Sequence, residues 1–301
     1  MKFAIFTKTF RDDLRRFLKL LSSVEEFNVE RIPYYISVPS ADRQLFLDAI
    51  GSRQVHVLTD EEILGSKLTQ SWKGQQLVKL QVWRTGFADA WFWFDSDSYF
   101  IRDFTVADFI RNDGSVALPA SRSSHVLDTH WESILAYMDD PSAFSLATAA
   151  EIGCAPALSL RAIPAFQRVA DALRRPSHDT RLLRIARFFG RTGCPLHYLP
   201  GAIWTRTSLS SFEEQVLAPF GMSYEDLLRF SPWEGVWIGE WEVASGMRGR
   251  HAIESPLLHI SSDKTIHRAR AAGLTESRLA ARYLGIQLAA RHQLLESLDE
   301  T

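Results

Sequence analysis

The chain has 301 residues, of which 46% are hydrophobic and 23% charged, as in an ordinary globular protein large enough for one sizeable domain. Its net charge of −2 excludes a general attraction to nucleic acid or to an anionic membrane. No run of about 18 apolar residues occurs and the first residues lack a signal-peptide layout, so we expect a cytoplasmic protein without a transmembrane helix. Two cysteines, Cys154 and Cys194, are too few for a disulfide framework and are expected to be reduced.

The first 120 residues alternate short apolar runs with amphipathic segments. This alternation predicts βαβ units, and hence an α/β fold whose central sheet is mostly parallel and flanked by helices. We expect strands over residues 3–7, 34–38, 54–58 and 91–94, with residues 115–118 returning to the same sheet. Helices are expected around the apolar stripe of residues 10–21, over residues 45–50, and from Ser71, a suitable N-cap, to Gly86, a suitable stop.

The remaining residues are less regular and more helical. Residues 161–191 predict two helices separated near Pro176, and residues 196–206 predict two short strands. Residues 275–298 predict a long closing helix, suited to packing on the domain or on the second subunit of a homodimer. Because the sequence contains no repeat, low-complexity segment or linker, we expect a single domain over residues 1–301, with an N-terminal half (1–120) and a C-terminal half (121–301).

Two carboxylates, Asp95 and Asp97, directly follow the most apolar run, Trp91-Phe92-Trp93-Phe94. Such a run is typical of a strand buried on both faces of a parallel sheet, and open α/β sheets bind ligands beyond the carboxyl ends of their strands. Side chains two residues apart on an extended segment point the same way. Both carboxylates can therefore reach one Mg²⁺ or Mn²⁺ ion, although Asp pairs also occur in ordinary surface turns.

Two further groups of residues accompany this pair. On the preceding helix, Gln76 and Lys79 share one face, which either aims amide and ammonium groups at a sugar or phosphate or is simply a polar surface. The segment that begins at Leu257 predicts a strand that ends in His259, followed five residues later by Lys264. A neutral imidazole can complete a metal site begun by two carboxylates, and a lysine can neutralise a departing diphosphate.

A tryptophan-rich segment, residues 233–242, contains the carboxylates Glu234, Glu240 and Glu242. Carboxylates held against indole rings are poorly solvated, which raises their pKa and suits them to general-base work. Tryptophan faces also stack on sugar rings. We take Glu240 as the best candidate base because Gly239 beside it allows close approach. The alternative is a helix N-terminus with ordinary acidic residues near the positive end of its dipole.

Taken together, these features resemble the GT-A class of nucleotide-sugar-dependent glycosyltransferases: a first strand with Thr7 at its tip, a Rossmann-like first half, an Asp-x-Asp after the fourth strand and a late histidine. The Gln-Gln-x-x-Lys-Leu segment at residues 75–80 and the later Glu-Trp-Glu at 240–242 look closest to a poorly characterised group of bacterial glycosyltransferase-like proteins. The spacing of His259 and Lys264 is also similar to that in retaining galactosyltransferases of the glycogenin type, although the Gly and Pro-Trp that accompany them there are absent here.

This resemblance implies transfer of a sugar from a nucleoside diphosphate, with UDP expected, to a hydroxyl of a glycan or lipid-linked glycan, as in polysaccharide biosynthesis. The N-terminal half would bind the nucleotide and the C-terminal half the acceptor. The implied metal ligands for Mn²⁺ or Mg²⁺ are Asp95, Asp97 and His259. The implied donor-binding residues are Thr7, at the base, with Gln76, Lys79, Asp95 and Lys264. The implied catalytic residues are Glu240, which would deprotonate the acceptor, and Asp95.

Two other classes of protein remain open. A phosphatase of the haloacid-dehalogenase type also places Asp-x-Asp after an apolar strand, but normally after the first one, whereas about 90 residues precede the motif here. A non-catalytic carbohydrate-binding protein would need neither metal nor donor. The excess of about six positive charges over residues 161–191 is either a solvated helical face or a surface for an anionic acceptor or the headgroups of a membrane.

Overall fold

The computed structural model describes residues 1–65, 71–143, 178–191, 195–246, 250–289 and 298. Its centre is a five-stranded sheet in the order β3-β2-β1-β4-β7, in which the first four strands are parallel and β7 runs antiparallel to β4. The strands are β1 (Phe3–Lys8), β2 (Tyr34–Val38), β3 (His56–Thr59), β4 (Ala90–Trp93) and β7 (Ala202–Thr205). The predicted α/β fold with a mostly parallel central sheet is thereby confirmed.

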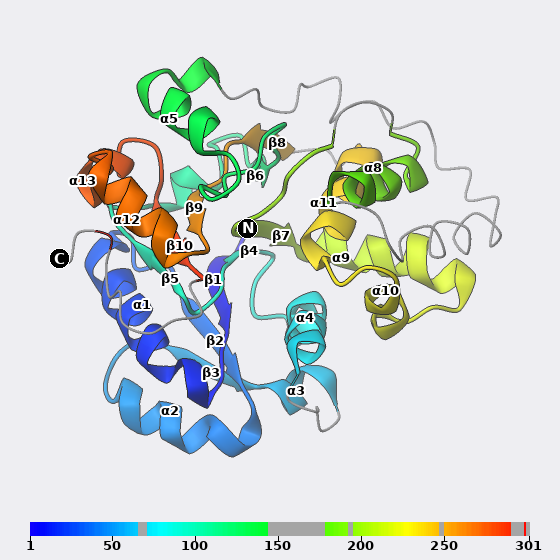
Figure 1. Cartoon of the computed structure of the whole chain (residues 1–301). Coiled ribbons are helices and arrows are strands. Elements are labelled where there is room, and N and C mark those ends of the chain that lie inside the picture. Colours follow the sequence, from blue (N-terminus) through cyan, green and yellow to red (C-terminus); the bar gives the residue numbers. More distant parts are fainter. Residues whose placement is uncertain (66–70, 144–177, 192–194, 247–249, 290–297, 299–301) are drawn as a thin grey trace.

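Alternating side chains of β1 and β4 build a separate apolar core on each face of this sheet. Phe6 and Trp93 point to the face that α4 (Trp72–Gln81) covers. Ile5 and Phe92 point to the opposite face, which is covered by α1 (Leu14–Phe27) and α2 (Arg43–Ile50) (Figure 1). Because all four side chains are buried, β4 is fixed between two layers of helices, and the residues that follow it are held in place.

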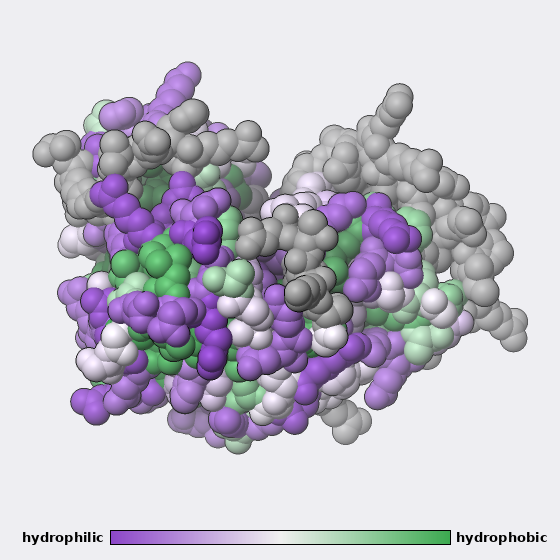
Figure 2. Space-filling view, turned by 90° about the horizontal axis from the view of Figure 1, so that it is seen from below, coloured by the Kyte–Doolittle hydropathy of each residue, from purple (hydrophilic) through white to green (hydrophobic). Residues whose placement is uncertain are grey.

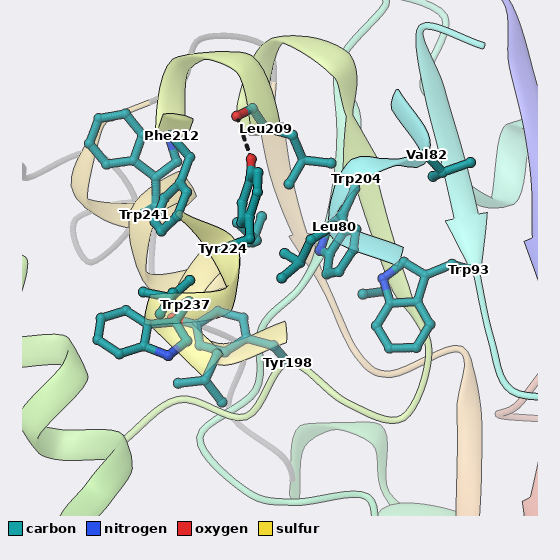
Figure 3. Packing of buried hydrophobic residues seen from close by; sticks show 14 of the residues in the cluster. Leu80, Val82, Trp93, Tyr198, Trp204, Leu209, Phe212, Tyr224, Trp237 and Trp241 are labelled. Carbon is teal, nitrogen blue, oxygen red and sulfur yellow. Dashed lines mark hydrogen bonds between the residues drawn. The ribbon is translucent and has the colours of Figure 1, made fainter. Parts of the chain in front are cut away.

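The core on the α4 side extends into four further helices: α8 (His178–Phe188), α9 (Arg206–Phe212), α10 (Tyr224–Phe230) and α11 (Glu234–Ala244). Trp93 of β4 packs against Trp204 of β7, with ring centroids 5.0 Å apart. Trp237 and Trp241 of α11 lie on the other side of the same cluster (Figure 3). Both are almost fully buried, so these two tryptophans are core residues and offer no stacking face to a sugar.

Two smaller sheets lie beside the central one. The first has the order β5-β10-β9, formed by β5 (Ser98–Phe100), β10 (Gly285–Leu288) and β9 (Leu257–Ile260). In the second, β6 (Val116–Pro119) pairs in parallel with β8 (Arg250–Ile253). The expectation that residues 115–118 return to the main sheet is therefore wrong, because β6 pairs with β8 instead. Residues 196–206 contain one strand, β7, where two were expected.

The long closing helix predicted over residues 275–298 is also wrong for the part that the structure describes. Helix α13 (Glu276–Leu279) has only four residues and is followed by β10. The first residue of this strand is a glycine, Gly285. A side chain there would collide with the backbone oxygen of Tyr99 on β5, so the close pairing of the two strands requires glycine at this position. The other residues of that prediction, 290–297, lie outside the described residues, as do both cysteines and residues 161–177 of the basic segment.

The remaining helices are α3 (Asp60–Leu64), α5 (Trp131–Asp139) and α12 (Asp263–Ala271). Seen from below, much of the described surface is hydrophilic, with the clearest group of apolar residues at the left of the view and smaller ones at the right (Figure 2). Among the described residues, no helix is long and apolar enough to cross a membrane.

Candidate active site

Helix α4 carries two of the predicted site residues, and its sequence fixes where it begins. Ser71 is its N-cap, with the side-chain oxygen accepting a hydrogen bond from the backbone N–H of Gly74 at 3.1 Å. The chain continues through a 3₁₀ turn at Val82–Thr85 to Gly86, whose φ of 70° stops it, as predicted. Gln76 and Lys79 are both buried on this helix, and both face the carboxyl end of β4.

Lys79 lies between two carboxylates from different elements. Its ammonium group donates a hydrogen bond to Oδ1 of Asp95 at 2.6 Å and lies 3.6 Å from Oε1 of Glu234, the first residue of α11. It also lies 4.2 Å from the ring centroid of Trp93. With its amide oriented so that both ends are satisfied, Gln76 donates to Glu234 and accepts a hydrogen bond from the Trp72 indole at 3.2 Å.

The predicted carboxylate pair is brought together by a residue that the sequence analysis missed. Nε2 of Gln287, on β10, donates to Oδ2 of Asp95 at 3.1 Å and to Oδ1 of Asp97 at 3.0 Å. The two carboxylates therefore face one atom, although Ser96 and Asp97 lie in a turn and not in the extended segment that was expected. In the register of β10 and β9, Gln287 lies opposite His259, which places the predicted histidine beside this cluster.

These residues surround a cavity of about 280 Å³ beyond the carboxyl end of β4. Its wall includes Gln76, Lys79, Asp95, Glu234, His259 and Gln287, with the aromatic side chains of Trp72, Trp93, Tyr198 and Trp233. A cavity with apolar and aromatic walls and a few convergent polar groups is the usual form of a small-molecule site. Its position beyond a parallel strand is also where open α/β sheets bind ligands.

Burial and neighbouring charges shift the proton affinities of the groups around this cavity. Burial raises the pKa of Glu234 to about 7, although the charge of Lys79 opposes the shift. Burial, followed by the negative charge of Asp95, raises the pKa of Asp97 to about 7. Burial lowers the pKa of Lys79, but the charges of Asp95 and Glu234 outweigh it and the net pKa lies above its ordinary value.

His259 is affected in the opposite direction to the two carboxyl groups. Burial lowers its pKa, and the charges of Asp128 and Asp95 and a hydrogen bond with Gln287 offset the shift only in part. The imidazole is thus held mostly neutral near pH 7, the form that can act as a metal ligand or as a hydrogen-bond acceptor.

A second cavity, of about 250 Å³, lies at the carboxyl ends of β1 and β2 and at the start of α3 and α4. Its wall includes Lys8, Phe10, Pro39, Asp60 and Gln75. Lys8 and Asp60 form a buried ion pair, with 3.0 Å between Nζ and Oδ2. Trp72, which is 50% exposed, lines both cavities.

Four predicted site residues do not line either cavity. Asp97 is one of them, although it accepts a hydrogen bond from Gln287, which does line the first cavity. Thr7 is fully buried inside β1 and accepts a hydrogen bond from the hydroxyl of Tyr34 at 3.1 Å. Lys264 is exposed on α12. Glu240 is fully buried and ion-paired with Arg191, which donates to it through Nε at 2.7 Å and through Nη2. Burial in an ion pair speaks against an acceptor-side role for Glu240, because a general base must reach its substrate.

The glycine beside Glu240 also has a structural explanation. A Cβ on Gly239 would collide with the ring of Tyr198, so the close approach that this glycine permits is to a neighbouring core residue. Glu242 is likewise buried and lies 3.0 Å from Nη2 of Arg250. Of the three carboxylates in residues 233–242, Glu234 lines the cavity, whereas Glu240 and Glu242 do not.

The described residues contain no group of three His, Cys, Asp or Glu side chains close enough together to hold a metal ion. His259 is therefore near Asp95 and Asp97 but is not placed with them as a ready third ligand. The two carboxylates themselves suit a hard cation, because both accept hydrogen bonds from the same nitrogen and so converge on one position.

Fold and site together define an α/β protein with a polar, aromatic-walled cavity beyond the carboxyl end of a central parallel strand. Residues 3–162 match the model of a family of unknown function, DUF6492, and the chain belongs to this family. The match includes β1 to β4 and the Asp-x-Asp, whereas Glu234, His259 and Gln287 lie beyond it. No curated protein matches the chain.

Solved structures similar to this chain include two glycosyltransferases. The apo structure of the bifunctional glycosyltransferase WbbM has 11% sequence identity and a TM-score of 0.46, and the match covers 96% of this chain and 46% of that one. The mannosyltransferase Ktr4p from S. cerevisiae has 13% identity and a TM-score of 0.44, covering 84% of this chain and 68% of that one. The chain thus spans less than half the length of the WbbM chain.

Proposed function

We propose that this protein is a glycosyltransferase that moves a sugar from a nucleoside diphosphate, with UDP expected, to a hydroxyl of a glycan or lipid-linked glycan. The observation that carries the proposal is the convergence of Asp95, Lys79, Glu234 and Gln76 in one cavity beyond β4. In this cavity, Asp95 can bind a cation and Glu234 can accept a proton. The ammonium group of Lys79 can bind a phosphate, and the aromatic walls can contact a sugar ring.

The donor would occupy both cavities. The second cavity combines an aromatic side chain, Phe10, with a carboxylate and an ammonium group, Asp60 and Lys8, which can hydrogen-bond the edge of a base. Trp72 lines both cavities, and a nucleotide whose base occupies the second cavity would extend its diphosphate past Trp72 toward Asp95 and Lys79. This arrangement moves the expected base pocket from Thr7 to the residues around Lys8 and Asp60.

Asp95 and Asp97 fit the Mn²⁺ or Mg²⁺ ion that such a reaction uses, since their carboxylates converge on one position and hard cations prefer oxygen ligands. When bound, the cation supplies positive charge that offsets the charge developing on the leaving diphosphate. Lys79 adds a second, permanent positive charge at the same place, because its ammonium group lies 2.6 Å from Asp95. The interactions with these positive charges compensate a diphosphate for the hydration that it loses on entering the cavity.

Glu234 is the residue best placed to act as a general base. In an inverting transfer, the acceptor oxygen would form a bond to the anomeric carbon, the bond from that carbon to the diphosphate would break, and the hydroxyl proton would pass to Glu234. A pKa of about 7 suits this role, because the carboxylate is available near neutral pH and still binds a proton well. Gln76 and Lys79 hold its orientation.

The proposal is tested by a melting-temperature screen of the protein with UDP-, GDP- and CMP-sugars, with and without Mn²⁺, followed by mass spectrometry of the products. We expect one nucleotide sugar to raise the melting temperature only when Mn²⁺ is present, and its sugar to be transferred slowly to water or to added glycans. Stabilisation by sugars alone would favour a carbohydrate-binding protein, and release of phosphate from simple phosphate esters would favour a phosphatase.

A further inference from the structure

The side chain of Gln287 lies at the centre of the acidic pair. It is only 7% exposed, and its Nε2 donates to Asp95 at 3.1 Å and to Asp97 at 3.0 Å. Strand β10 is paired on both sides, so that Gln287 lies opposite His259 of β9 and opposite Ser98 of β5. This pairing fixes the backbone of Gln287 and leaves the terminal amide as the part that can turn.

A cation shared by Asp95 and Asp97 would have to lie close to where the amide nitrogen of Gln287 now lies, because both carboxylates point to that atom. An amide NH₂ group has two donors and no lone pair for a metal, whereas an amide oxygen is a good ligand for hard cations. The side chain must therefore either leave this position when a cation binds or turn its oxygen toward it.

We infer that Gln287 is the third protein ligand of the cation, and that its amide turns over when the cation binds. This inference rests on the proposed function, which supplies the cation. Without the cation, the NH₂ group satisfies both carboxylates. With the cation bound, the amide oxygen coordinates it and the NH₂ group faces His259. The described residues contain no third His, Cys, Asp or Glu at this position, and the amide fills that place.

His259 becomes a positioning residue in this arrangement. A neutral imidazole has one nitrogen that donates and one that accepts, and which nitrogen carries the proton can change. It can therefore donate to the amide oxygen of Gln287 in the empty site and accept from its NH₂ group in the loaded site. Partners that orient a metal ligand in this way typically change metal affinity by about 10- to 100-fold.

The first test measures binding of Mn²⁺ alone, by calorimetry and by the electron paramagnetic resonance signal of unbound Mn²⁺. Gln287→Met keeps the approximate size of the side chain and removes the amide, and we expect it to weaken Mn²⁺ binding about 10- to 100-fold. Gln81→Met is the matched control, since Gln81 is 8% exposed on α4 and lines neither cavity, and it should leave Mn²⁺ binding unchanged. Equal Mn²⁺ affinity in Gln287→Met and the unchanged protein would overturn the ligand role while leaving the proposed function in place.

The second test compares melting temperatures in EDTA and in Mn²⁺. Gln287→Glu should melt lower than the unchanged protein in EDTA, because three carboxylates then repel one another, and should gain more from Mn²⁺. Gln287→Met should also melt lower in EDTA and should gain less from Mn²⁺. If Gln287 had only a structural role, the melting temperature of each variant would be lowered by the same amount in EDTA and in Mn²⁺. That result would contradict the inference.

The third test asks whether His259 acts through Gln287. His259→Ala should weaken Mn²⁺ binding in the unchanged protein but should add no further loss to Gln287→Met, as expected when two residues act as one unit. A further loss in the double variant would make His259 a ligand in its own right and overturn its positioning role. Failure of the unchanged protein to bind Mn²⁺ even with a nucleotide present would overturn both this inference and the metal dependence of the proposed function.

Discussion

Glu234 and Glu240 lie six residues apart on the same helix in opposite surroundings. Glu234 is at the N-terminus of α11, lines the cavity, and has Lys79 at 3.6 Å. Glu240 is two turns further along, is fully buried, and is held by Arg191. The tryptophan-rich sequence around both residues indicated poorly solvated carboxylates and could not show which one faces a cavity, because that depends on how α11 packs on α8 and α9.

Replacing each glutamate by glutamine should separate the two roles. We expect Glu234→Gln to lower turnover by about 10²-fold or more with little change in donor affinity, the scale of a lost general base. Glu240→Gln should instead destabilise the fold by about 3–5 kcal/mol, since it removes the carboxylate that pairs with the buried charge of Arg191. Turnover and urea unfolding of both variants check this prediction. A stable Glu240→Gln protein with lost turnover would reverse the assignment.

The raised pKa of Glu234 also predicts how stability depends on pH. Its folded-state value of about 7 lies above its ordinary value of 4.5, so its protonated form favours the fold. The contribution of this group is complete below its ordinary value and is lost as pH rises through about 7, up to about 3 kcal/mol. Glu234→Gln cannot titrate and should lose this part of the pH dependence. Urea unfolding from about pH 4 to about pH 8 measures it, and identical slopes in both proteins would contradict it.

At the scale of elements, the first half of the fold was predictable and the second half was not. In residues 1–100, apolar residues recur at regular spacing, Ser71 is a clear N-cap and Gly86 is a glycine stop. These local signals placed β1, β2, α4 and β4 correctly. Strand β10 has four residues, and its partners β5 and β9 lie far from it in the sequence. Short strands that depend on distant partners give little local signal, so Gln287 went unnoticed within a segment taken as a helix.

Gly285 links the packing of β10 to the site. Gly285→Ala would drive a methyl group into the backbone oxygen of Tyr99, displace β10 and move Gln287, two residues away. We expect a loss of about 1–3 kcal/mol in stability, with weaker Mn²⁺ binding. Gly51→Ala is the control: it has open space around it but a positive φ of 60°, so the backbone strain should cost about 1–3 kcal/mol and leave Mn²⁺ binding unchanged. Chemical unfolding and calorimetry measure both effects, and unchanged metal affinity in Gly285→Ala would contradict the link.

At the scale of the whole molecule, the basic segment is not one uniform surface. Arg191 is buried with Glu240 inside the core, whereas Arg187 is exposed on α8 and Arg184 is partly exposed. The excess of positive charge available to a partner is therefore smaller than the sequence suggested. Within the described part of the chain, Arg184 and Arg187 remain as residues for a peripheral contact with anionic headgroups or an anionic acceptor.

Flotation with anionic and neutral liposomes tests this contact. If α8 meets headgroups, the double charge reversal Arg184→Glu and Arg187→Glu should reduce flotation with anionic liposomes at low salt, by about 1 kcal/mol of binding free energy for each arginine removed. The double reversal Arg43→Glu and Arg53→Glu, at two exposed residues far from α8 in the sequence, changes the net charge by the same amount and serves as the control. No difference between the reversed variant and the unchanged protein would leave α8 as a solvated face.

The central claim is that the two carboxylates after β4 bind a cation that in turn binds a nucleotide diphosphate. Calorimetric titration of the preferred nucleotide sugar into the protein, in Mn²⁺ and in EDTA, tests it most directly, with Asp97→Ala beside the exposed control Asp48→Ala. We predict clearly tighter binding in Mn²⁺ for the unchanged protein and for Asp48→Ala, and no gain from Mn²⁺ for Asp97→Ala. Equal affinity of the unchanged protein in EDTA and in Mn²⁺ would contradict the claim.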